Sequence, residues 1–105
     1  MRRILPILVL LAPLPAGAQD AAEGRRLAEQ WCAHCHRIAP GGPGPASDAV
    51  PDFVTIAARP GRNAEAIATF LRTPHAGMPD HGLTLRQARD LAAHVVAQGD
   101  PRGAR

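Results

Sequence analysis

Hydrophobic side chains recur at helical spacing in three segments of the chain, and a shorter fourth segment shows a weaker version of the same pattern. The three segments are residues 21–33, 64–72 and 85–98, and the minor one is residues 52–58. The apolar positions are Gly24, Leu27, Ala28 and Trp31 in the first segment, Ile67, Phe70 and Leu71 in the second, and Ala88, Leu91, Ala92 and Val95 in the third. No segment alternates apolar and polar residues convincingly as a strand does. We therefore predict an all-α fold of three to four helices.

Capping residues stand at the expected starts of these helices. Asp20 precedes the first segment, and Glu23 three residues later would complete a capping box. Asn63 is a favourable cap before the second segment. Thr84 and Gln87 have the spacing of a capping box at the start of the third. These local signals support the helix starts that the hydrophobic pattern predicts.

Glycine and proline residues mark helix ends, loops and one close contact. Pro74 disfavours helix at the residue before it, and Gly99 stands where a C-terminal cap belongs. Gly24 lowers helix stability within an apolar face, so we expect another backbone to approach it closely. Two irregular segments, residues 39–51 and 73–83, are predicted to be the long loops between the helices.

The N-terminal residues have the order of a secretory signal peptide. Arg2 and Arg3 precede an apolar stretch, residues 4–14, and small residues follow at positions 16–18. The stretch is interrupted by two prolines and is shorter than the roughly 20 apolar residues that a membrane-spanning helix needs. We predict that residues 1–18 are removed on export and that residues 19–105 form one small domain without a membrane span.

Composition limits what this small domain can do. The full chain has twelve basic residues, all arginine, and nine acidic residues, and loss of two arginines with the signal peptide brings the mature chain close to neutrality. A nearly neutral chain lacks the excess of basic residues that is typical of nucleic-acid-binding domains. The chain has only three aromatic residues, one Trp and two Phe, and domains of this size often need a cofactor, metal or disulfides to complete their core.

The stretch WCAHCH, residues 31–36, contains both cysteines of the chain. A redox disulfide, half of a zinc site and covalent haem attachment all use this spacing. A thioredoxin-like pair starts a helix that follows a strand, whereas Cys32 and Cys35 end a predicted helix. Structural zinc needs four ligands, and a second closely spaced pair is missing. The motif C-x-x-C-H in an exported chain without strands indicates covalent c-type haem, with Cys32 and Cys35 as thioether attachment points and His36 as an iron ligand.

The sixth iron ligand is expected on the opposite side of the haem. Met78 is the only methionine after residue 18, and it lies in an irregular loop that has no need of a flexible core filler. A thioether ligand raises the reduction potential, and we predict Met78 in this role. His75 and His81, three residues to either side, are the competing ligands, although both are expected to be solvated loop residues.

These motifs resemble small class I c-type cytochromes over nearly all of the chain after residue 18. The resemblance implies a cytochrome c-like fold around one covalent haem c with His36 and Met78 as axial iron ligands. It also implies that Gly24 receives the last helix, at Leu91 and at an aromatic residue three positions later. Here that position holds His94, so we expect a weaker helix crossing. In the family a prolyl carbonyl after a Gly-Pro pair accepts the N–H of the proximal imidazole. Pro43 and Pro45 both follow a glycine here, and we favour Pro45 for this role.

Two axial ligands from the protein leave no open coordination position, which favours electron transfer over catalysis. We predict a non-enzymatic periplasmic carrier of single electrons, a monomer or small subunit. Its partners would be redox proteins of the cell envelope, such as a dehydrogenase, oxidase or reductase. The alternative is a haem-based ligand sensor or weak peroxidase, which would require Met78 to dissociate readily. Two haem propionates would need polar partners, for which Arg37, Arg59 and Arg62 are candidates.

Overall fold

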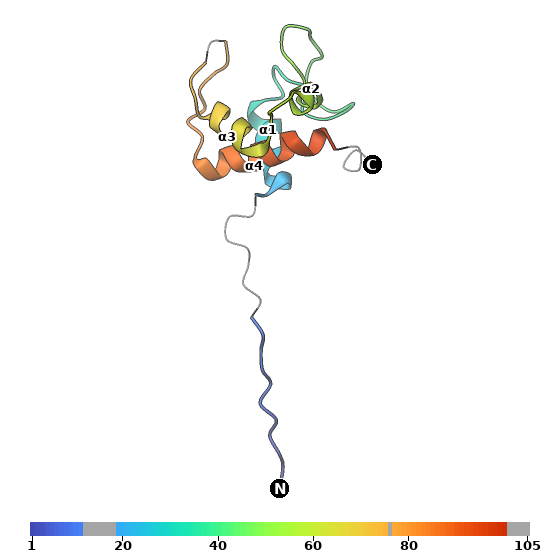
Figure 1. Ribbon diagram of the computed structural model, residues 1–105. Helices are drawn as coiled ribbons and strands as arrows, with labels where there is room; N and C mark the ends of the chain where they lie inside the picture. Colours follow the sequence, from blue (N-terminus) through green and yellow to red (C-terminus); the bar gives the residue numbers. More distant parts are fainter. Residues whose placement is uncertain (12–18, 76, 101–105) are drawn as a thin grey trace.

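Four helices and long loops make up the folded part of the chain that the structure describes (Figure 1). The computed structural model describes residues 1–11, 19–75 and 77–100. The helices are α1 (Ala21–Trp31), α2 (Phe53–Ala58), α3 (Ala64–Leu71) and α4 (Leu85–Gln98). No strand occurs within the described residues. The predicted all-α class is confirmed.

Helix α4 is the centre of the arrangement, because it contacts each of the other three helices. Within the described residues, α1, α2 and α3 have no contacts with one another as helices. The crossing of α1 and α4 lies at Gly24, where a Cβ atom would overlap the carbonyl of Asp90 on α4. The expected close backbone approach at Gly24 is therefore present, and only glycine permits it.

The helix starts agree with the capping signals, with one difference at α1. Thr84 and Gln87 form both bonds of a capping box at α4, and Asp20 accepts the N–H of Glu23 at α1. The second bond of the predicted capping box, from the Asp20 N–H to the Glu23 side chain, is wrong. The backbone N–H of Asp20 donates instead to the buried carboxylate of Asp90, at 2.9 Å, and Glu23 pairs with Arg26. The start of α1 is thus fastened to α4.

Helix α1 ends two residues earlier than predicted, at Trp31. The N–H groups of Cys32 and Ala33 both donate to the carbonyl of Ala28, at 2.8 and 3.0 Å. This sharing of one acceptor tightens the end of the helix into a turn. The N–H of His36 then donates to the carbonyl of Cys32 at 2.9 Å. The attachment motif therefore lies in a separate hydrogen-bonded turn directly after α1.

The core is small and rich in alanine. Leu91 and Ile38 are its largest fully buried side chains. Its buried members are Leu27, Ala28, Cys32, Ile38, Phe53, Ile67, Ala68, Ala88, Leu91, Ala92 and Val95. Because hydrophobic stabilisation scales with the apolar area removed from water, alanines contribute little each. Such a core is consistent with a fold completed by a large apolar cofactor.

The N-terminal residues 1–11 are exposed and form neither helix nor strand. None of the helices in the described part of the chain has the length and apolar character that a bilayer crossing requires. The expected cleavage segment, residues 16–18, and the last residues of the predicted domain, 101–105, lie outside the described residues.

Candidate functional site

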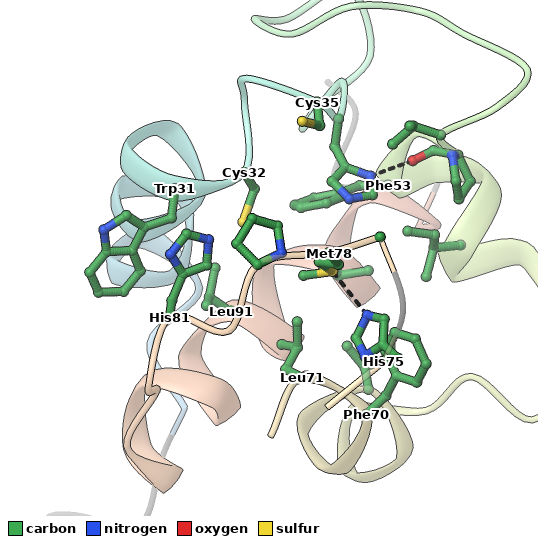
Figure 2. Close-up of a pocket in the computed structure, with 18 of the residues that line it drawn as sticks. Trp31, Cys32, Cys35, Phe53, Phe70, Leu71, His75, Met78, His81 and Leu91 are labelled. Carbon is green, nitrogen blue, oxygen red and sulfur yellow. Dashed lines mark hydrogen bonds between the residues drawn. The ribbon is translucent and has the colours of Figure 1, made fainter. Parts of the chain in front are cut away.

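A cavity of about 480 Å³ lies beside the attachment turn. Its volume falls within the range of roughly 300–1,000 Å³ typical of cofactor and ligand sites. The side chains around it come from the end of α1, from α2, α3 and α4, and from both long loops (Figure 2). Apolar members of the lining include Trp31, Phe53, Ile56, Phe70, Leu71, Leu91 and Val95.

Both cysteines line this cavity from the turn after α1. They are not joined in a disulfide; Cys32 is buried and Cys35 is exposed. The turn thus presents two sulfur atoms at one edge of the cavity, as two thioether bonds to one porphyrin would require.

The imidazole of His36 has a defined orientation. Its Nδ1 lies 2.6 Å from the carbonyl oxygen of Pro51, and since a carbonyl only accepts, Nδ1 carries the proton. A neutral ring then has its lone pair on Nε2, the form that binds a metal. Phe53 packs against the ring with centroids 5.6 Å apart. His36 also lines the cavity, so the chain holds the ring in a ligand-competent tautomer.

The assignment of Pro45 as the partner of His36 is wrong, and Pro51 takes that place. The loop after the turn closes early, because Ile38 donates to the carbonyl of Pro43 at 3.1 Å. At Gly44, with φ of 108°, the backbone lies against the carbonyl of His36, and the chain then runs outward through the exposed Pro45. The chain returns only near Phe53, whose N–H donates to the carbonyl of Arg37 at 3.0 Å.

Met78 lines the same cavity from the loop between α3 and α4. Its sulfur lies 3.1 Å from Nε2 of His75. His75 is half-buried and also lines the cavity, so the expectation of a solvated loop histidine is wrong for this residue. His81 is exposed, and its ring stacks on Trp31 at 5.6 Å with an interplanar angle of 11°. Figure 2 shows the two histidines on different sides of Met78.

The two competing chemistries find little support in this geometry. Burial raises the pKa of the Cys32 thiol to about 11, whereas a redox-active pair needs a lowered thiol pKa. Within the residues that the structure describes, no three His, Cys, Asp or Glu side chains converge as a metal-binding group. A structural zinc site needs four such ligands.

Comparison with known proteins agrees with the site. Residues 19–95 match the family described as cytochrome c oxidase, cbb3-type, subunit III. The chain is also 41% identical over 91 residues to cytochrome c-552 of Bradyrhizobium diazoefficiens, an alignment that covers 87% of this chain and 86% of that protein. The chain belongs to this cytochrome c family. No solved structure matches the sequence.

As a c-type cytochrome, the protein carries covalently bound haem c with its iron, and it is an electron-transfer protein. The residues present fit that group. The cavity is mainly apolar, and it brings together two thiols, an imidazole with a free lone pair on Nε2 and a thioether. Arg59 and Arg62, two of the candidate propionate partners, also line it.

Sequence reasoning missed three residues that contribute to the structure around His36 and Phe53. The carbonyl of Pro51 carries no residue-type signal, because every residue has a carbonyl. Ile38 is fully buried, yet it lies in a segment without periodicity. His94 is also buried, and its Nε2 donates to the Ile38 carbonyl at 2.8 Å. The departure from an aromatic residue at position 94 was visible in the sequence, but its hydrogen-bond partner was not.

Proposed function

We propose that this cytochrome is a periplasmic carrier that passes single electrons between redox partners of the cell envelope. Residues 1–18 would serve as a cleaved signal peptide, which leaves residues 19–105 as the mature domain. The paired arginines, the short apolar stretch and the small residues before position 19 support export. Cell fractionation, with the intact mass of the mature protein, tests both location and cleavage. A cytoplasmic protein that retained residues 1–18 would contradict the proposal.

We assign Cys32 and Cys35 as the thioether attachment points and His36 and Met78 as the axial iron ligands. The observation that carries this assignment is that one cavity collects both thiols, the imidazole and the thioether. His36 comes from the turn after α1, whereas Met78 comes from the loop before α4. Two distant segments therefore supply the two ligand atoms that a six-coordinate iron would need from the protein.

The haem, when bound, supplies the one-electron redox chemistry. The chain holds His36 by the hydrogen bond to Pro51 and by contact with Phe53, which limits movement of the ring. The apolar lining keeps water away from the site. Ligation of the iron by both His36 and Met78 would leave no open coordination position for an oxygen-derived substrate, which suits electron transfer and disfavours peroxidase chemistry.

Its partners would be redox proteins of the cell envelope, namely a dehydrogenase, an oxidase or a reductase. The family is named for a subunit of a cbb3-type oxidase, so an oxidase is the first partner to test. Complexes of electron-transfer proteins often bury less than about 1,200 Å², and mild conditions are therefore needed to recover one. Co-purification after gentle crosslinking would separate a free monomeric carrier from a small subunit of a larger complex.

Optical spectroscopy of the holoprotein tests the ligand assignment. Ligation by Met78 predicts a thioether-to-iron charge-transfer band in the oxidised protein and no carbon monoxide binding in the reduced protein. Rapid carbon monoxide binding would favour the alternative function, a ligand sensor or weak peroxidase. Replacement of Met78 by Ala should abolish the band and lower the potential.

A further inference from the structure

The loop segment that contains Met78 lies between two glycines, Gly77 and Gly82. Both have positive φ, 82° and 62°, and nothing lies within 4 Å of the Cβ that a larger residue would place there. Within the described residues 77–82, hydrogen bonds link only residues of the same loop. The position of this segment beside the cavity therefore depends on its side-chain contacts.

A ring contact joins the segment to helix α1. The imidazole of His81 stacks on the indole of Trp31, with centroids 5.6 Å apart and an interplanar angle of 11°, and Figure 2 shows the two rings side by side. Both residues line the cavity. His81 comes three residues after Met78, whereas Trp31 directly precedes Cys32. The stack therefore connects the loop of the thioether with the turn of the two thiols.

Trp31 is a firm platform for this contact. It is the last residue of α1, and its half-buried side chain packs against the hydrophobic core. Helix α1 is in turn fixed against α4 at Gly24. Aromatic pairs stabilise an arrangement by a factor of about 2–10 in an equilibrium constant. One end of the stack thus belongs to the rigid part of the fold, and the other belongs to the segment between the glycines.

We infer that the stack of His81 on Trp31 holds the Met78 segment closed over the cavity and thereby limits displacement of the thioether by external ligands. This inference rests on the proposed assignment of Met78 as an iron ligand. Outward movement of the segment separates the two rings, so displacement of the sulfur costs the free energy of the stack. His81 is then a positioning residue that acts through Met78, and the pair favours a closed electron carrier over a ligand sensor.

Added imidazole measures this restraint in the oxidised holoprotein. Its binding breaks the sulfur–iron bond, forms a nitrogen–iron bond and transfers no electron. Loss of the thioether-to-iron charge-transfer band during titration gives the affinity for imidazole. His81→Ala should keep the band before imidazole is added, and it should bind imidazole roughly 2- to 10-fold more tightly than the wild type. His81→Phe, which retains a flat ring, should resemble the wild type.

A double-mutant cycle with Trp31→Leu separates stacking from a simple loss of bulk at position 81. Leucine keeps an apolar side chain against the core. His81→Ala should raise the affinity for imidazole when Trp31 is present, but it should have no effect in the Trp31→Leu background. The control is His34, an exposed histidine of the attachment turn that also lines the cavity, and His34→Ala should bind imidazole as the wild type does. Far-ultraviolet circular dichroism verifies that each variant is folded.

The outcomes separate this inference from the proposed function. A wild-type affinity for imidazole in His81→Ala overturns the inference and leaves Met78 as the ligand. An equal gain from His81→Ala in both backgrounds, or an equal gain from His34→Ala, also overturns it. So does His81→Phe that binds imidazole as tightly as His81→Ala. A wild-type holoprotein without the charge-transfer band overturns the assignment of Met78 itself, and the inference with it.

Discussion

The imidazole of His94 donates a hydrogen bond from Nε2 to the carbonyl of Ile38, at 2.8 Å and across 56 positions of sequence. The other ring nitrogen, Nδ1, accepts from the side-chain amide of Gln98 at 3.1 Å. The ring also meets Phe53 edge-on, and Phe53 in turn contacts His36. His94 therefore ties α4 to the loop that follows the attachment turn, and it requires a neutral ring to do so.

We expect His94 to make stability fall in mild acid. Burial is the main cause that lowers its pKa; nearby Arg25 also lowers it, whereas the bond to Ile38 and nearby Glu29 oppose the shift. Because the folded pKa lies below the ordinary value of about 6.5, the unfolded chain takes up this proton first as pH falls. The contribution of the neutral ring is complete above about pH 6.5 and is lost progressively below it.

Urea unfolding of the holoprotein and of His94→Phe at pH 7.5 and pH 5 measures this effect. At pH 7.5 the variant should be less stable by about 1–3 kcal/mol, because the Ile38 carbonyl loses its partner. The difference in stability between the two proteins should narrow at pH 5. There only the wild type has a buried imidazole that resists protonation in the folded state while it is protonated in the unfolded state. An equal loss of stability with pH in both proteins would contradict this role of His94.

Replacement of Gly24 by alanine should destabilise the crossing of α1 and α4. The new Cβ would overlap the Asp90 carbonyl, and relief requires a shift of one helix backbone. Overpacking of this kind typically costs about 1–3 kcal/mol. Gln30→Ala, on the exposed side of α1, is the control and should be nearly neutral. Thermal unfolding compares the two, and an unchanged midpoint for Gly24→Ala would mean that the crossing is looser than described.

Gly44→Ala should impair the attachment region more than Gly41→Ala does. Both glycines have positive φ, 108° at Gly44 and 63° at Gly41, so both substitutions strain the backbone. A Cβ on Gly44 would also overlap the carbonyl of His36, whereas nothing lies within 4 Å of one on Gly41. The ratio of haem absorbance to protein should fall further for Gly44→Ala. Equal ratios would show that strain alone, and not contact with His36, sets the cost.

Mass spectrometry under denaturing conditions should detect haem on the wild-type polypeptide and on each single variant, Cys32→Ala or Cys35→Ala. The double variant should have the mass of the bare polypeptide, because covalent attachment requires at least one of the two thiols. His34→Ala, within the same turn, is the control and should retain haem fully. Haem that remained bound to the denatured double variant would contradict the attachment assignment.

The parts of the fold that could be predicted are those set by short-range interactions. Thr84 and Gln87 are three residues apart, and their capping box followed from that spacing alone. Gly24 indicated a close backbone contact because glycine lowers helix stability, and a close approach of another backbone explains its presence in an apolar helix face. The haem motif was equally local, since Cys32, Cys35 and His36 lie within five consecutive residues.

The parts that could not be predicted depend on backbone atoms brought together by long loops. Pro51 and Pro45 offer the same carbonyl group, and only the course of the chain around Gly44 decides between them. The orientation of His75 likewise depends on the Thr73 carbonyl, 2.8 Å from its Nδ1, and on the ring of Phe70 in α3. The predicted hydrogen bond from the Asp20 N–H to the Glu23 side chain does not form, because this N–H donates to Asp90, which is distant in sequence.

The alanine-rich core around α4 has a consequence for how long the protein persists in the cell. Four of the eleven buried core residues are alanines, so the helices gain less from one another than larger side chains would give until the cofactor fills the space beside them. A chain that misses attachment should therefore open often and be degraded early, while loaded molecules persist. Proteolysis would then remove the molecules that lack the cofactor, with no separate recognition step.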